Sequence, residues 1–132
     1  MRKTDTKTGR KPVIVPLNLN AVNRIVISHL DEGIHTPYAI DPYQLARDPL
    51  AESFTIVASE KIRGAYQALR ASEPYPDPAL HCHPSWRIVF FGRDDESLLE
   101  AYTDRFGVQG EIAGKTVGFS HAAFLRWLEG EV

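Results

Sequence analysis

Residues 86–92 read WRIVFFG, and this stretch gives the clearest indication of secondary structure in the chain. It is rich in aromatic and β-branched residues, and it ends at a glycine. Such residues favour the pleated surface of a sheet, and a short continuous apolar run that stops at a turn residue is typical of a buried strand. The stretch therefore predicts a strand inside the core, and the rest of the fold is arranged around it.

The segment after this strand predicts a helix over residues 94–106. Asp94 or Asp95 can serve as its N-cap, and Gly107 stands where such a helix would end. Its inward face would hold the apolar residues at helical spacing, Leu98, Leu99, Tyr102 and Phe106.

The last 22 residues of the sequence predict a hairpin followed by a helix. The run EIAGKTVGF (residues 111–119) is typical of two short strands that turn at Ala113 and Gly114. Ser120 can then cap a final helix that buries Phe124, Trp127 and Leu128.

The sequence before the strand favours helices. Asn18 or Asn20 can cap a helix that ends near Gly33, with apolar residues recurring at helical spacing: Val22, Ile25, Val26, His29 and Leu30. The pair Asp41-Pro42 predicts a short helix, and Asp48-Pro49 a long one reaching about Ala71, because proline is favoured in the first turn behind a cap. Val13, Ile14 and Val15 stand between two prolines and predict a short edge strand.

Together these elements predict an α+β fold in which three to four helices pack on a small, mostly antiparallel sheet. With 132 residues the chain has the size of one domain, and a domain of this size can bury a core without disulfides. We expect a single compact domain over residues 12–132, preceded by a basic flexible tail over residues 1–11.

Composition and charge limit the classes of function. The first eleven residues carry a net charge of +4, which leaves −6 for the rest of the chain. The single cysteine, Cys82, the absence of an N-terminal apolar run and the shortness of all apolar runs predict a cytoplasmic protein with no membrane partner. An acidic body makes nucleic acid an unfavoured partner, because phosphate is bound mainly by basic residues.

The run His81-Cys82-His83 raises the possibility of a metal site. In an extended chain, residues two apart face the same side, so both imidazoles could reach one zinc or other transition-metal ion. A third ligand would have to come from a distant residue, namely His29, His35, Asp41, Asp77 or His121. In the opposing interpretation, Asp77-Pro78 begins a helical turn that places the two histidines on different faces. We favour a polar loop and no cofactor, and keep metal binding by His81 and His83 as the alternative.

Two other motifs do not hold when their mechanics are considered, and a third is kept as an alternative. Gly114-Lys115-Thr116 lacks the first glycine of a P-loop, since Gln109 stands in its place, and no histidine beyond the adjacent His121 follows Ser120 to complete a catalytic triad. Residues 110–130 resemble a helix-turn-helix in their small and apolar positions, and DNA binding through this segment is a second alternative.

No complete catalytic constellation is present in the sequence, so we expect a noncatalytic binding or regulatory module. Its Pro/Tyr-rich loops (residues 35–49 and 73–86) have the composition of protein interfaces and would contact another protein or a second copy of the chain. The candidate partner-binding residues are His35, Tyr38, Tyr43, Tyr75 and Trp86. The alternative is a small metal-dependent or histidine-based enzyme that uses His81 and His83.

Overall fold

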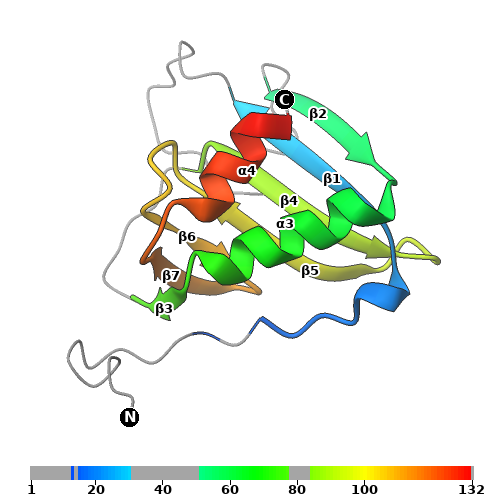
Figure 1. Ribbon diagram of the computed structural model, residues 1–132, viewed down its shortest axis with the longest axis horizontal. Coiled ribbons are helices and arrows are strands. Elements are labelled where there is room, and N and C mark those ends of the chain that lie inside the picture. Colours follow the sequence, from blue (N-terminus) through cyan, green and yellow to red (C-terminus); the bar gives the residue numbers. More distant parts are fainter. Residues whose placement is uncertain (1–12, 14, 31–50, 78–83, 132) are drawn as a thin grey trace.

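The computed structural model describes residues 13, 15–30, 51–77 and 84–131. In this part of the chain a single antiparallel sheet of seven strands packs against two α-helices (Figure 1). The strands are β1 (Val22–Leu30), β2 (Ala51–Ile56), β3 (Pro74–Pro76), β4 (Trp86–Gly92), β5 (Ser97–Thr103), β6 (Gln109–Ile112) and β7 (Lys115–Phe119), in the order β2-β1-β4-β5-β6-β7-β3. The helices are α3 (Ser59–Ala71) and α4 (Ala123–Glu131), and a 3-10 turn, η1 (Leu19–Ala21), precedes β1.

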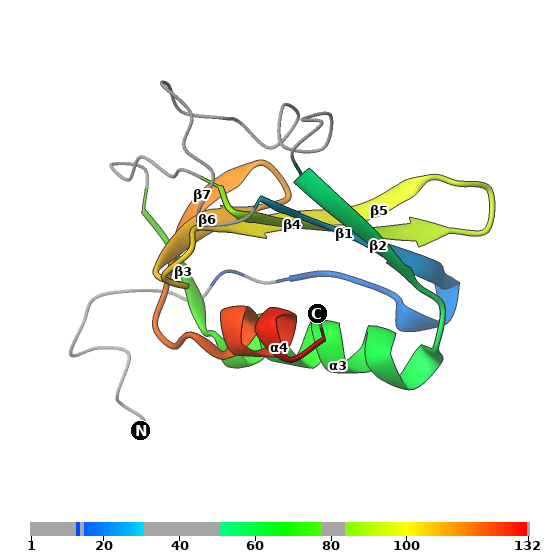
Figure 2. The same cartoon turned by 90° about the horizontal axis from the view of Figure 1, so that it is seen from above.

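The two α-helices lie side by side on one face of the sheet (Figure 2). Helix α3 buries Ile62, Ala65 and Leu69, and α4 buries Phe124, Leu125 and Leu128. The sheet contributes to the same core Ile25, Ile27, Trp86, Ile88, Phe90, Leu99, Ala101, Ile112, Val117 and Phe119. The hydrophobic core therefore fills the space between sheet and helices, and the opposite face of the sheet carries no helix of the described chain.

The predicted central strand is confirmed as β4, which lies between β1 and β5. Ile88 and Phe90 are fully buried on the helix side. Val89 is only 1% exposed on the other side, because successive residues of a strand face opposite ways. Burial on both faces explains why this stretch is continuously apolar and does not alternate.

The predicted hairpin and the final helix are also confirmed. Strands β6 and β7 pair as Glu111 with Thr116 and Ile112 with Lys115. Their two-residue turn holds Ala113 at φ 51° and Gly114 at φ 82°, the left-handed geometry that matches the twist of a hairpin. This hairpin is incompatible with the helix-turn-helix resemblance of residues 110–130, because that motif requires a helix where β6 and β7 lie.

The helix predicted over residues 22–30 was wrong, because these residues form strand β1. The helical spacing is real, yet the segment alternates as well: Ile25 and Ile27 face the helices, and Ser28 is buried on the opposite face. Its β-branched residues fit a sheet better than a helix. Asn18 does act as a cap, but only of η1, where its Oδ1 accepts the backbone N–H of Asn20 at 3.1 Å.

The long helix predicted from Asp48-Pro49 to Ala71 was wrong in its first part. Residues 51–56 form strand β2, paired with β1, and α3 begins only at Ser59. Thr55, Ile56 and Val57 are consecutive β-branched residues, which lose side-chain freedom in a helix. The last turn of α3 ends where predicted, at Ala71.

The helix predicted over residues 94–106 is strand β5, the clearest case in which pairing overrides local preference. Leu98, Leu99 and Ala101 are good helix formers, but the segment lies between β4 and β6 and hydrogen bonds to both. The expected three to four helices are therefore two in the described part of the chain. The short helix predicted at Asp41-Pro42 and the tail lie outside the described residues.

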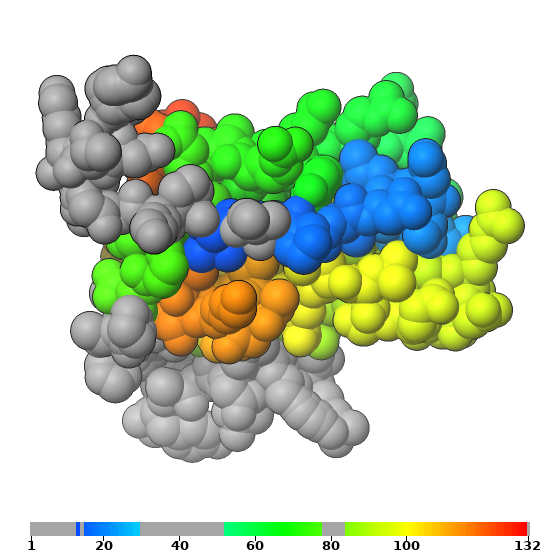
Figure 3. All heavy atoms as spheres, turned by 90° about the horizontal axis from the view of Figure 1, so that it is seen from below, coloured from blue at the N-terminus to red at the C-terminus, as the bar shows by residue number. Residues whose placement is uncertain are grey.

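Ahead of η1 the chain packs along the seam between α3 and the strands that follow β4 (Figure 3). Val15 is 6% exposed, and its carbonyl accepts the hydroxyl of Tyr66 at 2.5 Å. The backbone N–H of Val13 donates to the carbonyl of Pro74 at 2.8 Å. The predicted edge strand at this point is not formed by the described residues, although Val13 and Val15 do pack on the core.

Within the described ranges, no helix is long and apolar enough to span a membrane.

Candidate functional site

Apart from Val57 at the end of β2, the most exposed large apolar side chains of the described residues lie on the turn between β5 and β6. We name this turn, residues 104–108, the Phe106 loop. Phe106 is 62% exposed and Val108 is 50% exposed. The guanidinium of Arg105 lies over the ring of Phe106, 4.8 Å from its centre. An aromatic residue, an arginine and a valine are thus displayed together on one short turn.

The backbone of the Phe106 loop is held from both ends. The buried carboxylate of Asp104 accepts the backbone N–H groups of Val108 at 3.0 Å and Gln109 at 3.4 Å. The carbonyl of Val108 accepts the N–H of Phe119 at 2.8 Å, which ties the loop to β7. The exposed side chains therefore stand on a fixed backbone.

Gly107 packs the same loop against helix α4. Its φ is +70°, a conformation that other residues rarely adopt, and a Cβ at this position would lie 2.9 Å from the Cβ of Leu125. The loop can approach the helix this closely only because residue 107 has no side chain. Figure 1 shows the turn at the end of the sheet where the chain enters α4.

Strand β7 lies between β6, which follows the Phe106 loop, and β3, which contains Tyr75. Val108 hydrogen bonds to Phe119 of β7, and Phe119 pairs with Pro74 of β3. One residue further along, Gln109 of β6 pairs with Gly118 of β7, and Gly118 pairs with Tyr75 of β3. The tyrosine ring lies over Gly118, where an added Cβ would meet it at 2.5 Å. One predicted binding residue thus lies on the same end of the sheet as the exposed apolar loop.

The other predicted binding residues do not gather there. Trp86 is only 4% exposed and belongs to the core, where its ring stacks on the imidazole of His29 with 3.7 Å between ring centres. His35, Tyr38 and Tyr43 lie outside the described residues, so their part in binding stays a prediction.

The metal site also stays a prediction. His81 and His83 lie outside the described residues, and the described residues contain no group of three or more potential ligands. His121, one of the proposed third ligands, lies 3.4 Å from the carboxylate of Glu73, and His29 is engaged with Trp86.

A row of polar residues crosses the helix-free face of the sheet. It follows the strand register through Ser53, Ser28, Arg87, Tyr102, Glu111 and Thr116. Arg87 pairs with Glu100, the hydroxyl of Tyr102 donates to Glu111 at 2.7 Å, and the hydroxyls of Ser28 and Ser53 lie 3.3 Å apart. These groups satisfy one another across neighbouring strands, so the row stabilises the sheet.

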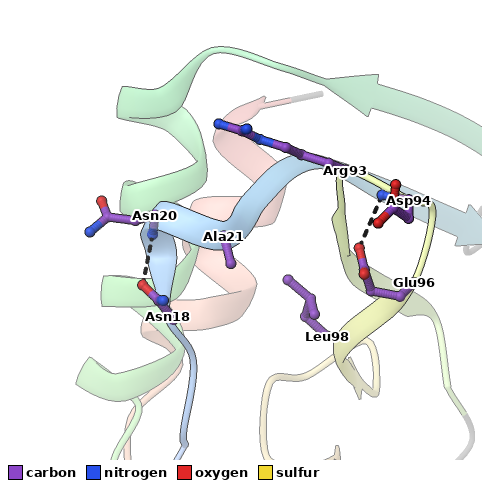
Figure 4. A pocket seen from close by; sticks show the side chains of 7 residues that line it. All are labelled: Asn18, Asn20, Ala21, Arg93, Asp94, Glu96 and Leu98. Carbon is purple, nitrogen blue, oxygen red and sulfur yellow. Dashed lines mark hydrogen bonds between the residues drawn. The ribbon is translucent and has the colours of Figure 1, made fainter.

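An open groove of about 360 Å³ lies at the opposite end of the molecule, between η1 and the turn from β4 to β5 (Figure 4). It is lined by Asn18, Asn20, Ala21, Arg93, Asp94, Glu96 and Leu98. Glu96 accepts the backbone N–H of Asp94 at 3.2 Å, and the amide of Asn18 is engaged as a cap. The charged side chains at its rim are exposed, so the groove does not hold a desolvated polar group that could orient a ligand.

The sequence analysis missed Phe106 because it assigned that residue to the inner face of a helix. The signal that could have found it is local: Asp104 and Gly107 stand three residues apart between apolar segments, which is typical of a tight turn. In such a turn an intervening phenylalanine has no sheet or helix to bury it.

Comparison of the chain with protein-family models, with curated proteins and with solved structures found no match.

Proposed function

We propose that this protein is a protein-binding module that inserts Phe106 into an apolar pocket of its partner. The observation that carries the proposal is a phenylalanine that is 62% exposed on a backbone held by Asp104 and Gly107. Full burial of such a side chain is worth about 1.5–3 kcal/mol. Most of this free energy is not gained on folding, because the ring stays exposed, and it would be gained when a partner covers the ring.

The fixed backbone supports this proposal in energetic terms. Association costs conformational entropy when loops and side chains become ordered, and a loop that is already ordered avoids part of this cost. Two hydrogen bonds from one carboxylate and a close contact with α4 order the Phe106 loop before any partner arrives.

The composition of the loop supports it as well. Aromatic residues and arginine are enriched among the residues that dominate binding energy in interfaces. Arg105 lies over Phe106 and can contribute both a charge and a flat surface. We propose in addition that the Pro/Tyr-rich segments predicted from the sequence, residues 73–86 and 35–49, contact the same partner.

The test is quantitative capture of partners on immobilised wild-type protein and on the variant Phe106→Asp. We expect the variant to lose its specific partners, with an affinity loss of at least about 2 kcal/mol once a partner is isolated. Its thermal unfolding should stay close to that of the wild type, because an exposed side chain changes stability by no more than about 0.5 kcal/mol.

Two control variants isolate the effect of the ring. Ala113→Asp places the same charge on the exposed turn of the neighbouring hairpin, where an aspartate tolerates the positive φ of 51°. Phe106→Tyr keeps the aromatic surface. Both should capture the same proteins as the wild type, and retention of those proteins by Phe106→Asp would contradict the proposal.

A further inference from the structure

The two edges of the sheet are protected to different degrees. Edge strand β3 has three residues, two of which are prolines, and the carbonyl of Pro74 already accepts the N–H of Val13. Edge strand β2 has six residues, AESFTI, without proline or lysine. Proline, lysine and short length are the usual means by which an edge avoids pairing with another strand, and β2 uses none of them.

The pattern of hydrogen bonds identifies which backbone groups of β2 point outward. The N–H of Asp104 donates to Gln109 and the N–H of Ala113 to Glu100, so the even-numbered residues of β5 bond to β6. Along each strand, residues that bond to one neighbouring strand alternate with residues that bond to the other. The residue pairs between β5 and β4, β4 and β1, and β1 and β2 therefore show which residues of β2 bond to β1. In β2, Glu52, Phe54 and Ile56 bond to β1, which leaves the outer groups of Ala51, Ser53 and Thr55.

The outer edge of β2 is also open to solvent. Ser53 and Thr55 are exposed, and Val57, immediately after the strand, is 70% exposed. Phe54 and Ile56 pack against the core from the helix side but remain only partly buried. Among the described residues no strand pairs with this edge, which stands beside incompletely covered apolar side chains.

We propose that β2 pairs in antiparallel fashion with β2 of a second copy, so that the sheets of both copies join into one. An antiparallel partner is self-complementary, as a twofold dimer requires, because outward residues of one copy meet outward residues of the other. In the register centred on Phe54, Ser53 bonds to Thr55 of the other copy and Ala51 lies opposite Val57.

The side chains and charges fit this register. Phe54 meets its symmetry mate in a non-hydrogen-bonded pair, where side chains approach most closely, and the two rings extend the core on the helix side. The only charge of the strand, Glu52, lies opposite Ile56. The two Glu52 carboxylates are then about 13 Å apart along the strand direction, beyond the screening length of about 8 Å at physiological salt.

This dimer is independent of the proposed Phe106 site. Strand β2 is one edge of the sheet, whereas the Phe106 loop joins β5 and β6 on the other side of β1 and β4. Both Phe106 loops therefore remain free in the dimer, which would present them as a bivalent pair.

Sedimentation velocity over a concentration series up to about 1 mM tests the proposal with purified full-length protein and the variant Thr55→Pro. Proline removes an N–H that points away from β1, so the variant should keep its fold and become monomeric, whereas the wild type dimerises. Thr55→Val keeps the N–H and serves as the matched control, and it should dimerise like the wild type. Phe106→Asp should dimerise as well, which separates this result from the test of the proposed function.

Cross-linking tests the register and does not depend on the proline variant being folded. In a Cys82→Ser background, Phe54→Cys should form an intermolecular disulfide under mild oxidation, since directly opposed residues have Cα atoms within bridging distance. Ser53→Cys alone should not, because its symmetry mate lies two residues along the strand. A monomeric wild type, a Thr55→Pro variant that still dimerises, or equal cross-linking at both positions would overturn the proposal.

Discussion

Trp86 and Phe106 lie near the same end of the β4–β5 strand pair, where Trp86 pairs with Thr103, but they have opposite surroundings. Trp86 is 4% exposed and stacks on His29, whereas Phe106 is 62% exposed with Arg105 over its ring. Both are aromatic residues close to turns in the sequence, and nothing in their type distinguishes them. The difference arises because Trp86 points from β4 toward the helices, while Phe106 is carried by a turn that lies beyond the sheet.

Alanine substitution should therefore lower stability strongly at Trp86 and hardly at all at Phe106. Trp86→Ala should lower the free energy of unfolding by about 3–5 kcal/mol, because it leaves a cavity in the core. Phe106→Ala should change it by no more than about 0.5 kcal/mol. Urea denaturation of both variants measures this difference, and a loss below about 1 kcal/mol for Trp86→Ala would show that its environment is wrongly described.

At the scale of elements, the sequence predicted those segments whose local pattern and pairing agree. Strand β4, the β6–β7 hairpin and helix α4 have strand, turn and helix signals that match their final surroundings. Strands β1, β2 and β5 were predicted as helices, since their apolar residues also fit a period of 3.6. Register with a neighbouring strand, which decided these cases, is a long-range property that a single segment does not contain.

The start of α4 shows how one element depends on a distant one. Ser120 was predicted as its cap, but the hydroxyl of Ser120 donates to the carbonyl of Glu73 at 3.0 Å. The N–H of Phe124 donates instead to the hydroxyl of Ser72, which is fully buried at the end of α3. The hydroxyl of Ser72 also donates to the carbonyl of Ala68 at 3.1 Å, so it joins the two helices.

Ser72→Ala should consequently destabilise the protein more than Ser120→Ala. Removal of the Ser72 hydroxyl leaves the buried N–H of Phe124 without its acceptor, at a cost of about 1–3 kcal/mol. The hydroxyl of Ser120 is exposed, and water can replace it, so we expect a loss of about 0.5 kcal/mol or less. Chemical denaturation of the two variants compares them, and equal losses would mean that α4 does not depend on Ser72.

At the scale of the whole molecule, the α+β class and the antiparallel pairing follow from the sequence, but the balance between helix and strand does not. The described residues form two layers, a sheet of seven strands and a pair of helices that covers one of its faces. Of the candidate site, the exposed Phe106 was not predicted, and binding through Tyr75 stays a prediction. The exposure of a side chain depends on the element that carries it. Because residues 94–106 were predicted as a helix, Phe106 was expected to be buried and was not recognised as a site residue.

Two truncations of the N-terminus should differ in their effect on the free energy of unfolding, because only the longer one removes residues of the core. Residues 1–11 lie outside the described residues, and because residues 2–10 include no apolar side chain, their deletion should leave folding and self-association intact. Deletion of residues 2–17 should lower the free energy of unfolding by more than about 2 kcal/mol, since it removes the buried Val15 and the acceptor of the Tyr66 hydroxyl. Thermal and chemical unfolding of both deletions measure the difference.

Comparison of the full-length protein with the deletion of residues 2–10 tests whether the tail binds nucleic acid. The tail has a charge of +4 and the rest of the chain −6, so any contact with phosphate should depend on the tail and weaken steeply with salt. We expect no measurable binding of a short DNA duplex at low salt, with or without residues 2–10, because the body of the protein repels a polyanion. Strong, salt-sensitive binding that disappears with the deletion would contradict this expectation and would make nucleic acid a partner of the N-terminal tail.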